Sequence, residues 1–261
     1  MIDYAPILLR IPVFVLVFFR LAGMMLFAPL FGSSQIPKRV RVMLVLVLAM
    51  GTCQSVKAVA LPETSWQLAL GIGGEMAFGL AMGILMSFVF IAAQWAGEMI
   101  GQQMGFNIGQ TFDPQFGGGG SLMGDLYFWL TMVIFLSVGG HHAMLRGVRD
   151  SFDKLPLLSL SVNQSLFDLM VELFQSATTL ALRLASPVLV TMLAVDLSLG
   201  LIGRTLPQFN VMQAGMSVRS MIGMMVVIAG LVLTGQVIES ALRDSSDTVR
   251  SGWVTPPAGA R

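Results

Sequence analysis

Three acidic residues interrupt the apolar stretches of this 261-residue chain, where ionisable side chains often carry function. Glu75 precedes a long uncharged run, Glu98 follows it, and Asp196 lies in the middle of a later apolar segment. Such carboxylates can pass protons, or they can pair with arginine, glutamine or backbone donors of neighbouring helices. Because no carboxylate pair recurs within one helix, the sequence favours the structural role and leaves a proton path as the alternative.

Other patterns of catalytic or metal-binding residues are missing from the sequence. Neither GxxxxGK[ST] nor GxGxxG occurs, so a phosphate cradle is not expected. His141 and His142 are adjacent and point in different directions on a helix, whereas metal ligation usually needs i, i+4 spacing and further ligands. Cys53 is the only cysteine, which rules out an internal disulfide and a cysteine cluster. We therefore expect no enzyme activity, no cofactor and no metal site.

The composition indicates an integral membrane protein. Hydrophobic residues make up 55% of the chain and charged residues 11%, against roughly a quarter in soluble domains. A formal net charge of +1 and scattered Lys and Arg argue against a nucleic-acid surface. The 20 methionines suit surfaces that must seal or rearrange, although membrane cores also use methionine freely.

The N-terminal half predicts three apolar helices. The first runs through residues 1–31 and contains Arg20, which at that depth should face protein or water. A second helix, through about Val59, opens with three basic residues that mark the cytoplasmic side by the positive-inside rule. The third starts near Trp66 and continues into a segment too polar for lipid.

A stripe of glycines follows on this third helix. Gly97, Gly101, Gly105 and Gly109 are spaced four residues apart, which places them on one helical face, and Gly79 with Gly83 makes another GxxxG face. Each glycine costs about 1 kcal/mol of helix stability relative to alanine, so the stripe needs a compensating gain. Close backbone approach between helices supplies one, so we expect helix packing along these glycines and predict that the stripe is an assembly face.

The helix is expected to break at Phe112-Asp113-Pro114, before a run of four glycines. This loop can be a plug that closes a channel or a passive linker. Its flanking apolar side chains suit a plug better than a solvated linker. The predicted gate or plug residues are Phe106, Phe112, Asp113, Pro114, Phe116, Gly117, Gly118, Gly119, Gly120 and Leu122.

The C-terminal half predicts an amphipathic helix, then an apolar helix opened by Pro187, then a last helix over Met216–Val237. The tail after Arg243 is polar and is expected to be disordered. Span counting gives five or six transmembrane helices, yet charges lie inside several spans and the basic loops do not alternate cleanly. Hydropathy therefore shows that the helices are buried in something apolar, without showing that it is lipid.

Four stretches together resemble the flagellar biosynthetic protein FliR family, the export-gate component of type III secretion. They are IPKRVR at 36–41, AGEMIGQQMGFNIGQTFDP at 96–114, GGHHAMLRGVRDSFDKLP at 139–156 and GLIGRTLPQFNV at 200–211. Their order, spacing and the chain length fit, and the resemblance covers nearly the whole chain. The AGExIGxQMG…DP and RxxPQ patterns are specific together, whereas the run of four glycines has no counterpart in the family pattern.

The resemblance implies an all-α, membrane-associated fold of helical hairpins, with a FliP-like part over 1–184, a gate loop at 105–122 and a FliQ-like hairpin over 185–243, before the tail at 244–261. It implies one FliR copy joining FliP and FliQ, with FlhB and FlhA alongside, in the inner membrane at the flagellar basal body. The assembly is expected to be raised largely out of the membrane, with its hydrophobic helices packed on each other. The buried polar or inter-subunit residues would be Arg20, Glu75, Glu98, Asp196, Arg204 and Gln208.

The interpretation is a non-enzymatic gate subunit through which unfolded flagellar proteins are secreted, with no nucleic acid involved. Two alternatives stay open. A virulence injectisome homologue would share the fold, and neighbouring genes for hook or filament proteins would distinguish it. A small-molecule secondary transporter would show an internal repeat with paired broken helices, which the sequence lacks.

Overall fold

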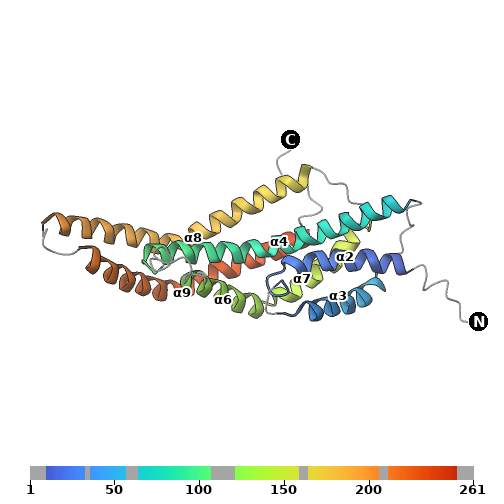
Figure 1. Ribbon diagram of the computed structural model, residues 1–261, viewed down its shortest axis with the longest axis horizontal. Helices are drawn as coiled ribbons and strands as arrows, with labels where there is room; N and C mark the ends of the chain where they lie inside the picture. Colours follow the sequence, from blue (N-terminus) through green and yellow to red (C-terminus); the bar gives the residue numbers. More distant parts are fainter. Residues whose placement is uncertain are drawn as a thin grey trace, which may run out of the picture. The chain divides into compact units, whose positions relative to one another are not determined.

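The computed structural model describes residues 10–32, 36–56, 64–106, 121–158, 164–205 and 211–251. Every element in these ranges is an α-helix (Figure 1), which confirms the predicted all-α fold. The elements are α2 (Ile11–Phe27), α3 (Lys38–Cys53), α4 (Ser65–Gln103), α6 (Leu122–Ser137), α7 (Gly140–Lys154), α8 (Gln164–Thr205) and α9 (Val211–Ser251).

Three helices are long and apolar enough to cross a membrane, among the residues described: α4, Val171–Thr205 of α8 and Gly215–Asp247 of α9. A fourth span results if α6 and α7 together make one broken span. These helices support the predicted membrane association. At 1.5 Å per residue, the 39 residues of α4 extend about 58 Å, roughly twice the hydrocarbon thickness of a bilayer. The polar residues near its C-terminal end can therefore lie outside the hydrocarbon.

The chain forms two compact units. Residues Met1–Phe88, Gly139–Leu173 and Leu242–Arg261 make the first unit, and residues Val89–Val138 and Phe174–Ala241 make the second. The boundary predicted after residue 184 falls inside α8 and inside the second unit. That the part before residue 184 resembles FliP and the part after it resembles FliQ therefore stays a prediction.

The first unit is built around α2. Leu16, Val17, Leu21 and Met24 recur at helical spacing and are fully or nearly fully buried. Helix α3 packs beside α2, as Figure 1 shows, and itself buries only Val45 and Ala49. One side of α2 is therefore core, while most of α3 remains exposed.

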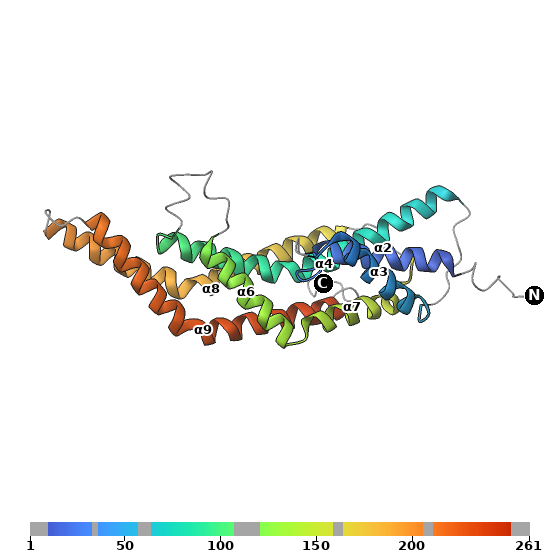
Figure 2. The same cartoon turned by 60° about the horizontal axis from the view of Figure 1, so that its bottom comes forward.

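Aromatic and hydrogen-bond contacts join the helices of the second unit. The ring of Phe90 on α4 lies 5.4 Å from that of Phe135 on α6. Helix α6 runs beside α9 (Figure 2), where Tyr127 and Thr234 share a side-chain hydrogen bond. The outward faces of α8 and α9 are apolar and exposed. They include Val190, Leu193, Leu197, Leu201, Met221, Met225, Ile228, Val232 and Leu233.

Pro187 does not open a helix, so that prediction is wrong. It lies inside the 42-residue helix α8. Proline removes the N–H that would bond to the carbonyl of Arg183, four residues earlier. The hydroxyl of Ser186 donates to that carbonyl at 3.0 Å. This replacement hydrogen bond lets the helix continue through the proline.

Two helix ends also differ from the prediction. Helix α3 ends at Cys53 instead of near Val59. The prediction of a disordered tail from residue 244 is wrong for residues 244–251, because α9 continues to Ser251. Its last turns follow the buried pair Ile238 and Leu242, which lie four residues apart on one face. Residues 244–247 are exposed or half-buried, so this part of the polar stretch is a helix in contact with solvent.

Candidate functional site

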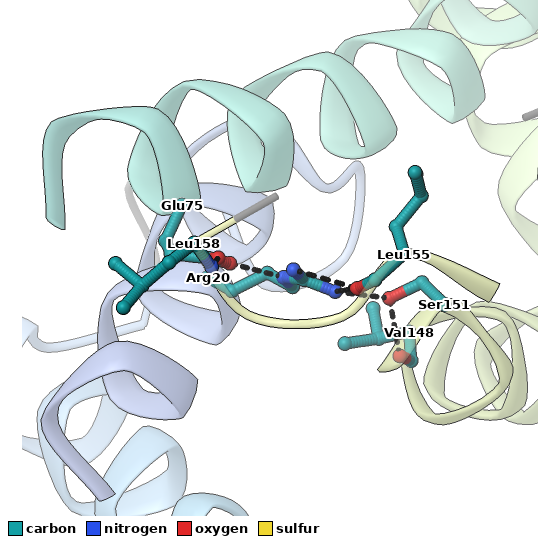
Figure 3. Close-up of polar contacts among 6 residues, drawn as sticks. All are labelled: Arg20, Glu75, Val148, Ser151, Leu155 and Leu158. Atoms are coloured by element: carbon teal, nitrogen blue, oxygen red, sulfur yellow. Dashed lines mark hydrogen bonds and ion pairs between the residues drawn. The ribbon is translucent and has the colours of Figure 1, made fainter. Parts of the chain in front are cut away.

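The largest fully buried side chain described is Arg20, from the middle of α2. Its Nε donates to Oε2 of Glu75 on α4 at 2.5 Å, and both side chains have no exposed surface (Figure 3). Removing two charges from water costs several kcal/mol per ion unless their geometry and remaining hydrogen bonds are satisfied. The surroundings of this pair meet that requirement.

The remaining partners come from α7 and the turn that follows it. Nη1 of Arg20 donates to Oγ of Ser151 at 3.1 Å, and Nη1 and Nη2 donate to the carbonyl of Leu155 at 3.3 and 3.2 Å. The second oxygen of Glu75, Oε1, accepts the backbone N–H of Leu158 at 3.0 Å. One ion pair thus ties α2, α4, α7 and the turn after α7 together, as Figure 3 shows.

The turn is held in an uncommon backbone conformation. Leu158 has φ of +66°, the only positive φ at a non-glycine position among the described residues. A left-handed leucine is unfavourable by about 1–2 kcal/mol, and its bond to Glu75 offsets part of that cost. The side chain of Leu158 lies against Gly71 of α4, where any Cβ would collide with it.

Two aromatic rings complete the site. The guanidinium carbon of Arg20 lies 4.9 Å from the ring centroid of Phe78 and 4.4 Å from that of Phe152. A cation over an aromatic face gains electrostatic stabilisation, which is larger when water is excluded. Because each carboxylate oxygen of Glu75 already accepts a hydrogen bond, this arrangement favours a fixed structural pair over a proton relay.

The other two carboxylates are placed differently. Glu98 is half-buried on α4 beside Gly124 of α6. Asp196 of α8 pairs with Nε of Arg219 on α9 at 2.7 Å, and these side chains are 38% and 40% exposed. No group of three His, Cys, Asp or Glu residues that could hold a metal ion occurs in the described part of the chain. Glu75 and Asp196 therefore belong to two separate ion pairs, and Glu98 is in neither of them.

Gly79 and Gly83 are points of close helix approach. A Cβ at Gly79 would collide with the carbonyl oxygen of Arg20, and one at Gly83 with that of Met24. On α2, a Cβ at Gly23 would likewise collide with the carbonyl oxygen of Met76 on α4. The two helices thus contact backbone to backbone, as small residues allow.

Gly97 on α4 packs against α6 of the same chain. A Cβ at Gly97 would lie 2.8 Å from the Cα of Gly124 and would collide with the carbonyl oxygen of Met123, both on α6. Gly101 is buried further along α4. The contact at Gly97 therefore serves folding of the chain, whereas the sequence had suggested partner subunits as well.

The prediction that Gly105 belongs to the helical stripe is wrong. Helix α4 ends at Gln103, and Gly105 has φ of +81°. Its N–H bonds to the carbonyl of Gln102 at 3.1 Å, and the N–H of Phe106 bonds to that of Gly101 at 3.0 Å. This pair of bonds is a Schellman motif, in which a left-handed glycine ends a helix. Gly109 lies outside the described residues.

The Gly105→Ala substitution should destabilise the folded chain by about 1–2 kcal/mol, because alanine is strained at positive φ. Gly105→Asn should cost less, since asparagine tolerates this conformation. Melting temperature in detergent, compared between the two variants, measures the effect. Equal stability of Gly105→Ala and the original chain would contradict the role of this residue as a helix stop.

Of the predicted gate residues, the structure describes only those at the two ends. Phe106 follows the end of α4, and Leu122 is an exposed residue at the start of α6. Between them, Phe112, Asp113, Pro114, Phe116 and Gly117–Gly120 lie outside the described residues. Arg204 is exposed near the end of α8, and Gln208 lies outside the described part.

Sequence reasoning missed the partners that surround Arg20. Phe78, Ser151, Phe152, Leu155 and Leu158 are ordinary residues whose role follows only from the fold. Ser151 lies on the last turn of α7, and Leu155 follows the end of that helix and takes part through its backbone carbonyl. Nothing in the local sequence indicates that either residue receives an arginine.

Comparison with known proteins gives a consistent result over most of the chain. A family described as bacterial export proteins, family 1, matches residues 11–245. The flagellar biosynthetic protein FliR of Bacillus subtilis is 27% identical over 92% of this chain and 94% of its own length, and that of Escherichia coli is 26% identical over 84% of each. The surface presentation of antigens protein SpaR of Shigella flexneri is 25% identical over 81% of this chain and 82% of its own.

Proposed function

Because this chain belongs to the bacterial export proteins, family 1, we propose that it is a structural, non-enzymatic subunit of the flagellar type III protein export gate. The match over residues 11–245 carries this proposal, since it includes α2 to α8 and most of α9. The FliR relatives support the same proposal, because the similarity covers 94% and 84% of their own lengths.

The exposed faces of α8 and α9 support a role inside an assembly. Monomeric soluble proteins rarely expose a continuous apolar patch larger than a few hundred Å². Asp196 and Arg219 form an ion pair within these apolar helices and remain more than a third exposed. Hydrocarbon is a poor environment for two partly exposed charges, whereas polar groups of another subunit or water would accommodate them.

The expected partners follow from this role. We propose that the chain occupies one position beside FliP and FliQ subunits, with FlhB and FlhA alongside, in the bacterial inner membrane at the flagellar basal body. Its cargo would be unfolded rod, hook and filament proteins. Deleting the gene should abolish swimming and leave these proteins inside the cell, which immunoblotting of the culture medium measures.

A virulence injectisome role is the second candidate, and the similarity to SpaR favours it as a related function. The same gene deletion distinguishes the flagellar role from the injectisome role. Loss of secreted effector proteins with normal swimming would assign the chain to an injectisome, while loss of swimming alone would assign it to the flagellum.

We further propose that the segment between Phe106 and Leu122 closes the resting channel. A pore wide enough for an unfolded polypeptide must be sealed when idle, and apolar side chains can block conduction at a constriction. The sequence supplies bulk at Phe112 and Phe116 and conformational freedom at Gly117–Gly120. Support comes from the ends of this segment, since α4 stops at a left-handed glycine and Ser121 caps the start of α6 through Gly124.

Deletion of Gly117–Gly120 should leave assembly intact and make cells that overproduce the complex leaky to small ions. The shortened segment would keep its aromatic residues and lose the freedom to place them in the channel. Membrane depolarisation or single-channel current measures the leak, and complex size is checked in parallel. An intact complex with unchanged resting conductance would leave the segment as a passive linker.

A further inference from the structure

Helix α3 has a continuous exposed apolar face. Val45 and Ala49, four residues apart, are the residues that it buries. On the opposite side lie Met43, Leu46, Val47 and Met50, also at helical spacing. The exposed fractions are 65% at Met43, 66% at Val47 and 61% at Met50, so this face has no partner in the described first unit.

The charge on α3 is confined to one end and has one sign. Lys38, Arg39 and Arg41 lie in its first four residues, and its 16 residues include no Asp or Glu. Lys38 and Arg39 are exposed. Arg39 precedes Met43 by four residues, so the exposed face begins with a cation and continues as apolar side chains.

The dimensions suit one leaflet of a bilayer. Sixteen residues extend about 24 Å, which is too short to cross about 30 Å of hydrocarbon. From Met43 to Met50 the apolar stripe rises about 10 Å, within the depth of one leaflet. Basic side chains with long stems can keep their charge among headgroups while the following turns enter the acyl region. Protein interfaces, by contrast, are depleted of lysine and of clustered charge at their core.

We propose that α3 inserts into one leaflet of a bilayer that contains acidic phospholipids. Lys38 and Arg39 contact the headgroup phosphates, and Met43, Leu46, Val47 and Met50 contact the acyl chains. The helix is then a lipid-binding element of the first unit, independent of whether the chain forms an export gate. It anchors the basic end of α3 at the membrane surface.

Nitroxide labels test the apolar face. Cysteines are introduced singly at Met43, Val47 and Met50 in a Cys53→Ser background, because Cys53 is the only native cysteine. The full chain, with the subunits that purify with it, is placed in nanodiscs of phosphatidylcholine and phosphatidylglycerol. The spectra should show collisions with oxygen and few with a water-soluble nickel chelate. Strong nickel collisions would mean exposure to water, and protection from both would mean cover by protein; either result overturns the proposal.

Lipid retention tests the basic end. The Lys38→Gln and Arg39→Gln substitutions should each lower the preference for phosphatidylglycerol over phosphatidylcholine by about fivefold, the effect of roughly one basic residue near an anionic surface. Native mass spectrometry of the purified protein counts the lipids retained. Arg149→Gln, at an exposed position on α7, is the matched control and should change the preference less. Equal retention in all variants would contradict the assignment of acidic headgroups.

Discussion

Replacing Glu75 by leucine is expected to remove most of the folded protein. The substitution leaves the guanidinium of Arg20 fully buried without its carboxylate, and leaves the N–H of Leu158 without its acceptor. Breaking a buried ion pair from one side typically costs about 3–5 kcal/mol, which is a large part of the stability of a domain. The yield of monodisperse protein after extraction in mild detergent, together with its melting temperature, measures the loss.

A double variant separates the charge effect from the loss of packing. Combining Arg20→Met with Glu75→Leu removes both buried charges and should recover much of the yield, because hydrophobic replacement of a buried pair is often close to neutral. The recovery is incomplete, since Ser151 and the carbonyl of Leu155 lose their donor. Normal stability of Glu75→Leu alone, or a double variant no better than that single variant, would contradict the structural role of the pair.

The Gly79→Ala substitution is expected to push α2 away from α4. The new methyl group would lie 2.9 Å from the backbone nitrogen of Met24 and collide with the carbonyl oxygen of Arg20. Backbone atoms cannot move aside as a flexible side chain can, so the cost should reach or exceed the usual overpacking range of about 1–3 kcal/mol. Displacement at this contact also disturbs Arg20 and its hydrogen bonds.

Gly73 provides the matched control on the same helix. Nothing lies within 4 Å of the position of its Cβ, so Gly73→Ala should stabilise α4 by about 1 kcal/mol through helix propensity alone. The two variants should therefore shift the melting temperature in opposite directions. A rise in both would show that α2 and α4 do not pack through Gly79.

Close helix packing at glycine could be predicted from spacing, but the end of the stripe could not. Gly79, Gly83 and Gly97 all meet backbone atoms of a neighbouring helix. Gly105 continues the same four-residue spacing and yet ends α4 in a left-handed conformation. Glycine suits both roles for the same reason, the absence of Cβ, so spacing alone does not separate them.

The burial of Arg20 followed from its apolar surroundings, whereas its partners did not. Glu75 is 55 residues away in sequence, and Ser151 is 131 residues away. No local pattern connects positions so far apart, because their meeting depends on how α2, α4 and α7 pack. The prediction at Pro187 was wrong for a local reason: proline usually opens or breaks a helix, but α8 continues through it, with the hydroxyl of Ser186 donating to the carbonyl of Arg183.

The subunit composition of the purified complex tests whether this chain is an export-gate subunit. The full chain, tagged at one end and produced from its own chromosomal locus, is extracted in mild detergent and analysed by native mass spectrometry. We expect one copy of this chain with two kinds of smaller membrane protein, FliP and FliQ. A monodisperse monomer, or an oligomer of this chain alone, would contradict the export-gate assignment and favour a secondary transporter.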